Sequence, residues 1–303
     1  MIYTCTVNPS IDYVIYVNPF EYGGLNRGEK PAYYPGGKGI NVSRILKRLD
    51  IANTALGFIG GFTGHFIEQA LLNEGIKTDF IKIDQETRIN LKLKTTKETE
   101  INGPGPTITD ENLALLVKQI KTIPKESTLV LAGSLPSSIP DNFYATIAEQ
   151  CAQQNIRVVA DTSSASLKAL IGIPLFLIKP NHHELGELFG VKIQSTKDAI
   201  YYGRKLQKQG ITHVIISMGG AGAIYLNDQM TLTANVPKGQ VQNTVGAGDS
   251  TVAGFLAGLV TGLSNKEAFR YAIASGSATA FNSDLAEKKD LEALIPLIDI
   301  SQS

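Results

Sequence analysis

Residues 243–250 read Asn-Thr-Val-Gly-Ala-Gly-Asp-Ser, and a run of small and apolar residues continues from there to Gly262. The run predicts a buried helix, so the two glycines form a tight turn at its N-terminus. Such a turn presents unpaired backbone N–H groups and the positive end of the helix dipole, and it therefore binds anions, most often phosphate. The acid that follows, Asp249, either complements the dipole or accepts a proton from a group that attacks a bound phosphate.

A second glycine-rich turn, Pro-Gly-Gly-Lys-Gly at residues 35–39, opens a predicted helix. Two such turns in one chain indicate two phosphate-bearing ligands, or one ligand with phosphate at both ends. Neither is a Walker A loop, because no Gly-x-x-x-x-Gly-Lys-Ser/Thr occurs. No Gly-x-Gly-x-x-Gly follows the first predicted strand either, so a nicotinamide-dependent oxidoreductase is only a distant alternative.

From residue 110 onward, predicted helices and strands alternate, which is typical of an α/β protein with a mainly parallel sheet covered on both faces. Ligands of such sheets bind at the carboxyl ends of the strands. The predicted helices are 40–49, 64–74, 110–121, 141–152, 164–170, 182–189, 196–208, 247–261 and 265–281. The predicted strands are 2–8, 54–59, a short extended segment at 79–83, 127–132, 156–160, 175–178, 212–217, 222–226 and 231–236.

Residues 87–94 alternate apolar and polar side chains, which is typical of a half-exposed antiparallel strand. With 98–101 they predict a hairpin that pairs with a strand at 13–17, while 18–35 predicts loops and short strands. We therefore expect one domain over 1–303, with a small sheet from about 13–35 and 87–105 over one face. The second apolar face of this sheet needs a partner, which predicts a homodimer.

The charge and cysteine content exclude several classes of protein. The chain of 303 residues contains 28 basic residues (Lys and Arg) and 28 acidic residues (Asp and Glu), so its net charge is near zero. It has no basic stripe that would indicate binding to nucleic acid or to a membrane surface. No apolar run reaches membrane-spanning length. The chain enters a strand at its N-terminus without a targeting signal, and its two cysteines, Cys5 and Cys151, make no disulfide framework. We expect a cytoplasmic protein.

Three segments together resemble the ribokinase-like (PfkB) carbohydrate kinases: 35–43, 179–185 and 244–249. The resemblance covers essentially the whole chain in the order of the family. It implies a ribokinase-like three-layer α/β/α sandwich with a mainly parallel central sheet and a small β-sheet lid. It also implies ATP-dependent phosphorylation of a sugar hydroxyl.

Within the family, residues 6–12, 23–27 and 87–105 are most similar to members that convert fructose 1-phosphate and ATP to fructose 1,6-bisphosphate and ADP. Members that act on tagatose 6-phosphate or fructose 6-phosphate share much of this pattern and remain alternatives. A sugar-phosphate-binding regulator without activity is a third, which the intact Asp249 and both glycine turns disfavour.

The resemblance implies that Asp249 is the general base, ionised at neutral pH with an ordinary carboxyl pKa. The N–H groups of Gly246, Ala247 and Gly248 would form an anion hole for the transferring phosphoryl group. On the sugar side, Asp12 would accept hydrogen bonds from hydroxyls, and Lys38, Arg88 and Arg27 would bind the phosphate of the substrate. The remaining sugar-side residues implied are Gly36, Gly37, Asn41 and Ser134.

The resemblance also implies a nucleotide side for ATP, with adenine against the 265–281 helix near Ser277. The other residues expected there are Lys179, Asn181, Ser217, Gly219, Gly222 and Thr244. Glu184 would act on Mg²⁺ through water, since Mg²⁺ keeps several waters and needs few protein ligands. Backbone around Asn243, Val245 and Asn282 would suit a monovalent cation such as K⁺, although the sequence leaves open whether one is required.

Overall fold

The computed structural model describes residues 1–96 and 98–302. Its strands are β1 (Ile2–Thr6), β2 (Ser10–Tyr16), β3 (Glu29–Gly36), β4 (Asn53–Gly60), β5 (Lys77–Ile83), β6 (Arg88–Lys94), β7 (Glu98–Asn102), β8 (Thr128–Ala132), β9 (Arg157–Asp161), β10 (Leu175–Ile178), β11 (Ile211–Ser217), β12 (Ala223–Leu226), β13 (Thr231–Ala234) and β14 (Ile300–Gln302). Its helices are α1 (Lys38–Arg48), α2 (Gly61–Asn73), α3 (Asp110–Lys121), α4 (Phe143–Gln153), α5 (Ser164–Ala169), α6 (His182–Phe189), α7 (Thr196–Gln207), α8 (Ala247–Val260), α9 (Asn265–Ala280) and α10 (Lys288–Leu294), with single 3₁₀ turns at Gly219–Ala221 and Ile295–Leu297.

The central sheet has the order β14-β13-β12-β11-β10-β9-β8-β1-β4-β5 in the described part of the chain. Every pair from β5 across to β11 is parallel, whereas β11 to β14 pair antiparallel. The predicted mainly parallel sheet is confirmed. The sequence analysis assigned no element to 288–302, where α10 and the edge strand β14 are short and carry little periodic signal.

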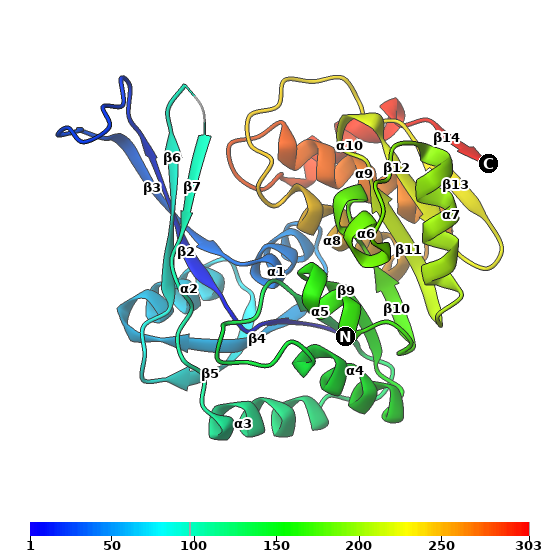
Figure 1. Ribbon diagram of the computed structural model, residues 1–303, viewed down its shortest axis with the longest axis horizontal. Coiled ribbons are helices and arrows are strands. Elements are labelled where there is room, and N and C mark those ends of the chain that lie inside the picture. Colours follow the sequence, from blue (N-terminus) through cyan, green and yellow to red (C-terminus); the bar gives the residue numbers. More distant parts are fainter. Residues whose placement is uncertain (97, 303) are drawn as a thin grey trace.

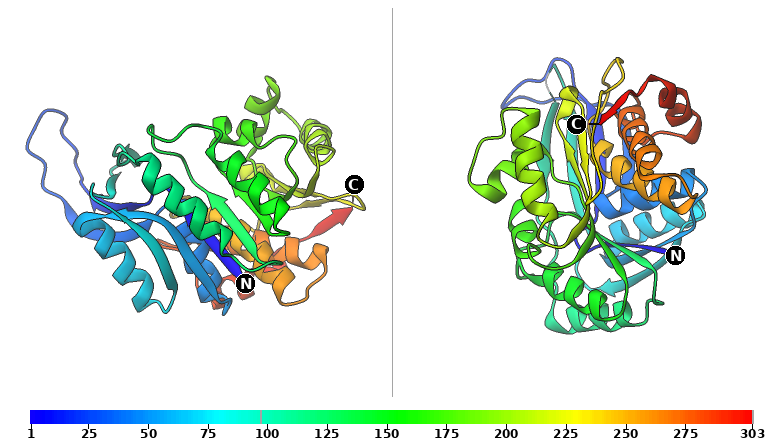
Figure 2. Two further views of the ribbon diagram at one scale, coloured as in Figure 1. Left: turned by 90° about the horizontal axis from the view of Figure 1, so that it is seen from below. Right: turned by 90° about the vertical axis from the view of Figure 1, so that its right-hand side faces the viewer.

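Successive side chains of the buried strands point to opposite faces of the central sheet, and they form one hydrophobic cluster on each face. In β8 every residue is buried, and Leu129 and Leu131 face the opposite side from Val130 and Ala132. Helices α3 to α7 cover the first side, and α1, α8, α9 and α10 cover the second. Figure 2 shows the two helical layers with the sheet between them. This is the three-layer α/β/α sandwich expected from the sequence.

A second sheet, with the order β3-β2-β6-β7, stands apart from the helical layers (Figure 1). The predicted pairing of the 87–101 hairpin with the strand near residue 13 is confirmed, because β2 pairs with β6 in parallel. The expectation of loops and only short strands over 18–35 is wrong for its second half, where β3 is eight residues long. Two prolines in β3 obscure its pattern, but an edge strand tolerates them.

In the described part of the chain, none of the helices is both long enough and apolar enough to span a membrane.

Candidate active site

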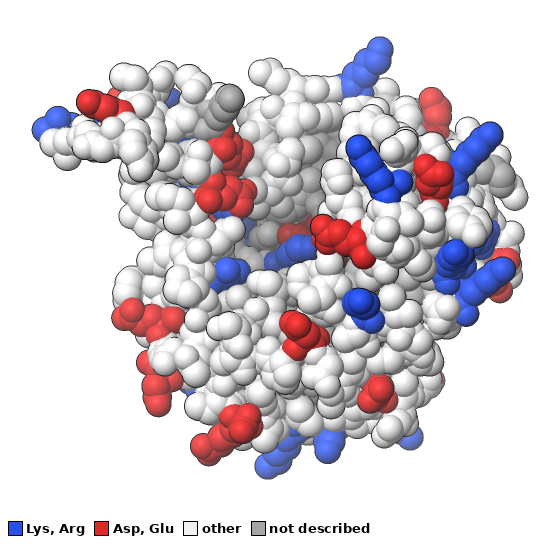
Figure 3. Space-filling view, in the orientation of Figure 1, with Lys and Arg blue, Asp and Glu red and all other residues white. Residues whose placement is uncertain are grey.

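The carboxyl ends of the parallel strands lie at one cavity beneath the small sheet. It has a volume of about 630 Å³, and we call it the polar cavity. Asn8 follows β1, Ser134 follows β8, Asp161 ends β9 and Lys179 follows β10, and all four line this cavity. Figure 3 shows the hollow between the small sheet and the rest of the molecule, with charged side chains at its floor. The topology thus brings residues that are distant in sequence to one place.

The glycine turn at 246–248 forms the N-terminus of α8, as the sequence predicts. Gly246 precedes the helix in the left-handed region, with φ of 79°. A Cβ added there would lie 2.5 Å from Cδ2 of Leu285, so this side chain would have to shift, and the backbone conformation itself favours glycine. A Cβ on Gly248 would lie 3.0 Å from Nζ of Lys179. The turn therefore places backbone N–H groups and a lysine ammonium beside the same space.

Asp249, in the first turn of α8, is buried and 5% exposed. Nδ2 of Asn41, on α1, donates to its Oδ2 at 2.8 Å. Burial and the charge of Asp161 raise the pKa of Asp249 to about 6, against the lowering effects of Lys38, the Asn41 hydrogen bond and Lys179. The expectation of an ordinary pKa is therefore wrong, because the sequence does not reveal the burial. At pH 7 the group is still about 90% ionised.

Asp161 is a charged residue of the site that the sequence analysis did not select. It is 2% exposed, and its carboxylate lies 3.0 Å from Nζ of Lys38 and 3.4 Å from Nζ of Lys179. Burial alone would raise the pKa of Asp161, but Lys179 and Lys38 hold it below the ordinary value. The charge of Asp161 in turn raises the pKa of Lys38. Lys38 and Asp161 therefore stay charged, and the two ion pairs of Asp161 hold Lys38 and Lys179 in place.

Asp12 lies on β2, on the face of the small sheet that borders the polar cavity. Its Oδ1 accepts hydrogen bonds from Oγ of Ser10 at 2.8 Å and from Nδ2 of Asn90 at 3.0 Å. A Cβ on Gly36 would lie 2.6 Å from the Asp12 carboxyl carbon, so the backbone approaches this acid closely. Gly37 follows with φ of 113° at the start of α1. The first glycine turn thus borders the same cavity as the second.

Arg88, at the start of β6, also lines the polar cavity. Its Nη2 donates to the Asn8 carbonyl at 3.1 Å, while its Nε is buried without a partner in the described structure. Burial lowers the pKa of Arg88, and the charge of Asp12 opposes this. By contrast, Arg27 is exposed in the loop between β2 and β3 and lines none of the cavities described here. The chain by itself therefore does not bring Arg27 to the other predicted sugar-side residues.

A second cavity of about 450 Å³ adjoins the first at Gly248 and Thr244, and we call it the apolar cavity. The predicted nucleotide-side residues Asn181, Ser217, Gly219, Gly222 and Ser277 all line it. Its other walls are mostly apolar and include Val236, Val241, Ile273, Ala280 and Phe281. The cavity lies against α9, the helix against which the sequence analysis placed adenine.

Glu184 and Asn181 form the N-terminus of α6 as a capping box. Oδ1 of Asn181 accepts from the Glu184 N–H at 2.9 Å, and Oε2 of Glu184 accepts from the Asn181 N–H at 2.8 Å. Among the described residues no hydrogen bond to the second carboxylate oxygen of Glu184 is found, and the residue lines the polar cavity. No group of three or more His, Cys, Asp or Glu in the described residues could hold a metal ion by itself.

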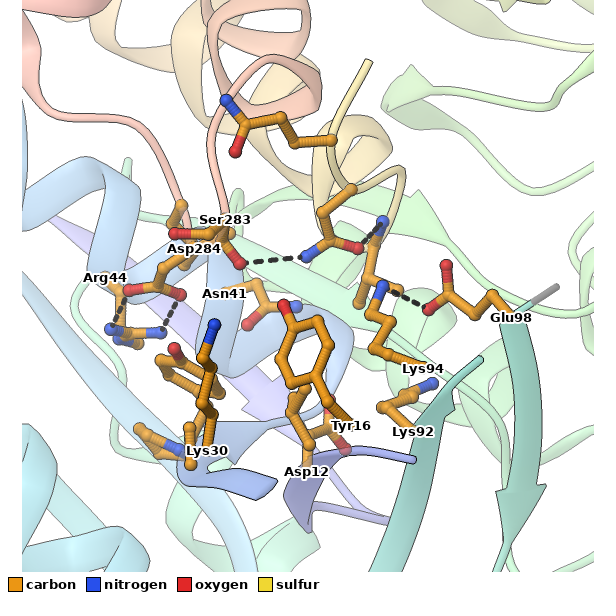
Figure 4. A pocket seen from close by; sticks show the side chains of 18 residues that line it. Asp12, Tyr16, Lys30, Asn41, Arg44, Lys92, Lys94, Glu98, Ser283 and Asp284 are labelled. Atoms are coloured by element: carbon orange, nitrogen blue, oxygen red, sulfur yellow. Dashed lines mark hydrogen bonds and ion pairs between the residues drawn. The ribbon is translucent and has the colours of Figure 1, made fainter. Parts of the chain in front are cut away.

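A third cavity, of about 260 Å³, lies between the small sheet and the loops near residues 243 and 284 (Figure 4). Asn243 and Val245 line it, and Nδ2 of Asn243 donates to the Ser283 carbonyl at 3.3 Å, which joins the two loops. Asn282 does not line it, and Nδ2 of its side chain donates to the Ala278 carbonyl at 2.8 Å. The chain therefore brings Asn243 and Val245, but not Asn282, to this cavity.

The fold is that of an α/β protein in which two adjoining cavities meet at a glycine turn and a buried acid, an arrangement suited to an anion. The model of the pfkB family carbohydrate kinases matches residues 6–290, so the chain belongs to this family. It is 51% identical to the 1-phosphofructokinase of Bacillus subtilis (strain 168), with all of both chains covered. It is 40% identical to the D-tagatose-1-phosphate kinase of Bacillus licheniformis, with 99% of each chain covered. The crystal structure of phosphofructokinase-2 from Escherichia coli in complex with potassium is similar with a TM-score of 0.93 and 28% identity, and 98% of each chain is covered. The predicted family and fold are confirmed.

Proposed function

We propose that the protein transfers the γ-phosphoryl group of ATP to the 6-hydroxyl of fructose 1-phosphate, which yields fructose 1,6-bisphosphate and ADP. One observation carries the proposal: Asp249 and the 246–248 turn lie where a polar cavity meets an apolar one. The first has the charges and size for a sugar phosphate, and the second has the walls for a nucleotide base. The 51% identity to a 1-phosphofructokinase over the whole chain supports the choice of sugar.

Asp249 takes the proton of the attacking hydroxyl. Asn41 holds one carboxylate oxygen at 2.8 Å, which leaves Oδ1 for the substrate. The sugar oxygen forms a bond to the γ-phosphorus, and the bond from that phosphorus to the bridging oxygen of ADP breaks. The N–H groups of Gly246, Ala247 and Gly248 stabilise the charge on the transferring group, which is the main contribution a protein makes to this reaction.

The cationic residues divide between two phosphates. Lys38 is held by Asp161 and lies in the field of Asp249, so we assign its charge to the transferring phosphoryl group and not, as the resemblance implied, to the phosphate of the substrate. Lys179, beside Gly248, acts on the same group from the nucleotide side. Arg88 and Ser134 then remain for the phosphate that the sugar already carries, and the planar guanidinium suits its oxygens. Asp12 orients the sugar by accepting from its hydroxyls.

The residues present fit Mg²⁺ and a monovalent cation. Mg²⁺ bound with ATP neutralises phosphate charge, and Glu184 would hold it through water with its unpaired oxygen. Backbone oxygens of Asn243, Val245 and Asn282 would hold K⁺ where the two loops meet, next to the turn that begins at Gly246. The similar Escherichia coli structure in complex with potassium supports this second assignment.

The outer face of the small sheet supports a homodimer. Tyr13 and Tyr33 stack there with ring centroids 4.7 Å apart, and Tyr33 and Ile101 are each 56% exposed. Ile89 is 44% exposed on the same sheet. In a dimer, the outer faces of two small sheets would pack against each other and bury these side chains. The inner face of each small sheet would then cover the polar cavity of its own chain, as a lid over a single domain. We expect the enzyme to act in the cytoplasm, where ATP and sugar phosphates are available.

A coupled assay of ADP formation tests the proposal. Fructose 1-phosphate should give a kcat/KM at least about tenfold above those of fructose 6-phosphate and tagatose 6-phosphate, since each correctly paired polar group contributes such a factor. Comparable values for the three sugars would contradict the substrate assignment. Absence of ADP formation with every ketohexose phosphate would contradict the kinase function itself.

A further inference from the structure

Asn90 is a buried polar residue on the inner face of the small sheet. It lies on β6 directly opposite Asp12 on β2, because the two strands pair in parallel with these residues in register. Its side chain is 6% exposed and lines the polar cavity. Its Nδ2 donates to Oγ of Ser10 and to Oδ1 of Asp12, both at 3.0 Å. Since Ser10 donates to the same Oδ1, this oxygen is held twice and Oδ2 of Asp12 is left for a ligand.

The hydrogen bonds also fix which way the Asn90 amide points. An ionised carboxylate only accepts hydrogen bonds, so the nitrogen of the amide must face Asp12 and the oxygen must face away from it. That oxygen, Oδ1, is buried at the wall of the polar cavity and has no hydrogen-bond partner in the described part of the chain. Buried acceptors are rarely left unpaired, and a binding site is one place where they are.

The neighbours of Asn90 on the same face have their own partners. Arg88, two residues before it, donates to the carbonyls of Asn8 and Gly103. Lys92, two residues after it, forms an ion pair of 2.6 Å with Glu100 on β7. Asn90 is therefore a neutral group between two cations, and its unpartnered oxygen and the Asp12 carboxylate are acceptors that line the same cavity.

We propose that Asn90 is a positioning and specificity residue: it fixes Asp12, and its free oxygen accepts a hydrogen bond from a neighbouring ring hydroxyl of the acceptor sugar. This inference rests on the proposed function. Two acceptors in a fixed arrangement read the configuration of two neighbouring hydroxyls. The phosphates of fructose and tagatose differ only in configuration at C4, so the pair distinguishes one epimer from the other.

The test compares kcat/KM for fructose 1-phosphate and for D-tagatose 1-phosphate in the wild type and in Asn90→Ala. The variant should lower kcat/KM for fructose 1-phosphate by about 10–100-fold, mainly through KM, because a hydroxyl loses its partner and Asp12 loses its support. The ratio of the two kcat/KM values should fall by about fivefold or more. The KM for ATP should stay within about twofold, since Asn90 does not line the apolar cavity.

A second variant, Asn90→Asp, keeps the shape and supplies a readout that a structural role would not give. It places a carboxylate against Asp12, with Arg88, Lys92, Lys94, Glu98 and Glu100 as the other charged groups of β6 and β7 on that face. Two adjacent carboxylates share a proton, so kcat/KM relative to the wild type should rise as pH falls from 8 to 6. A ratio to the wild type that does not change with pH would count against the contact with Asp12.

Asn227→Ala is the matched control. Asn227 is also a buried asparagine, 3% exposed, whose Oδ1 accepts from the N–H groups of Gln229 and Met230. Asn227→Ala should lower Tm and leave unchanged the ratio of kcat/KM for fructose 1-phosphate to kcat/KM for D-tagatose 1-phosphate. The role of Asn90 would be overturned if Asn90→Ala left the ratio of the kcat/KM values for the two sugar phosphates unchanged. It would also be overturned if kcat/KM fell by the same factor for the sugar phosphate and for ATP. A wild type without turnover of fructose 1-phosphate would instead contradict the proposed function.

Discussion

Replacing Asp249 with Asn should make the folded protein more stable. The pKa of this buried carboxyl is raised from 3.8 to about 6, mainly by burial and then by Asp161. Each unit corresponds to about 1.4 kcal/mol, so ionising Asp249 in the folded protein costs on the order of 2–3 kcal/mol at neutral pH. A neutral amide keeps much of the shape and avoids this cost. For a chain of this length the gain corresponds to a rise in Tm of roughly 3–6 °C at pH 8.

The sign of the pH dependence follows from proton binding. The folded state holds this proton more tightly than the unfolded state, so the contribution of Asp249 to stability falls as pH rises from about 4 to 6. The gain in stability of Asp249→Asn over the wild type should therefore be full at pH 8, about half as large at pH 5 and about a fifth as large at pH 4.

Thermal unfolding of both proteins at pH 8, 5 and 4 measures this effect. Asp141→Asn, at an exposed position, is the control, and its Tm should stay within about 1 °C of the wild type. A Tm of Asp249→Asn at or below the wild-type value at pH 8, or a gain that is independent of pH, would refute the reasoning.

Three further predictions concern the environment of Asp249, the glycine turn and the outer face. The wild-type kcat/KM should rise with pH about a midpoint near 6, and Asp161→Asn should move this midpoint downward, because Asp161 raises the pKa of Asp249; an upward shift in the pH profile would be inconsistent with the charges described. Gly246→Ala should lower both kcat and Tm, with a loss of stability of about 1–2 kcal/mol or more from the left-handed backbone alone. If Leu285 moved aside and the backbone relaxed, unfolding in denaturant would show no loss of stability, and this result would contradict the prediction. Ile101→Glu, on the outer face, should give a monomer in analytical ultracentrifugation while Ile101→Val remains a dimer; a monomeric wild type would remove the proposed dimer.

Local signals in the sequence were sufficient for the elements and for the two glycine turns. The turn at 246–248 could be predicted because glycine, the buried helix after it and Asp249 all lie within a short stretch. The inner and outer faces of the small sheet followed from strict alternation over 87–94, whereas β3 was obscured by its prolines.

Charges and contacts that depend on distant parts of the chain could not be predicted in the same way. Asp161 pairs with Lys38 and Lys179, which come from other elements and meet it only through the order of the sheet. The contact between Asn90 and Asp12 depends on the register of two strands, which no local pattern fixes. The raised pKa of Asp249 depends on burial by the whole fold.

The central claim is that Asp249 deprotonates a sugar hydroxyl that then attacks the γ-phosphate of ATP. The most direct test incubates wild type and Asp249→Asn with ATP and fructose 1-phosphate and follows the products by ³¹P NMR. The wild type should form fructose 1,6-bisphosphate and ADP in equal amounts, and Asp249→Asn should do so about 10²–10⁴ times more slowly. Formation of the bisphosphate by Asp249→Asn at the wild-type rate, or loss of ATP without a new sugar phosphate, would contradict the claim.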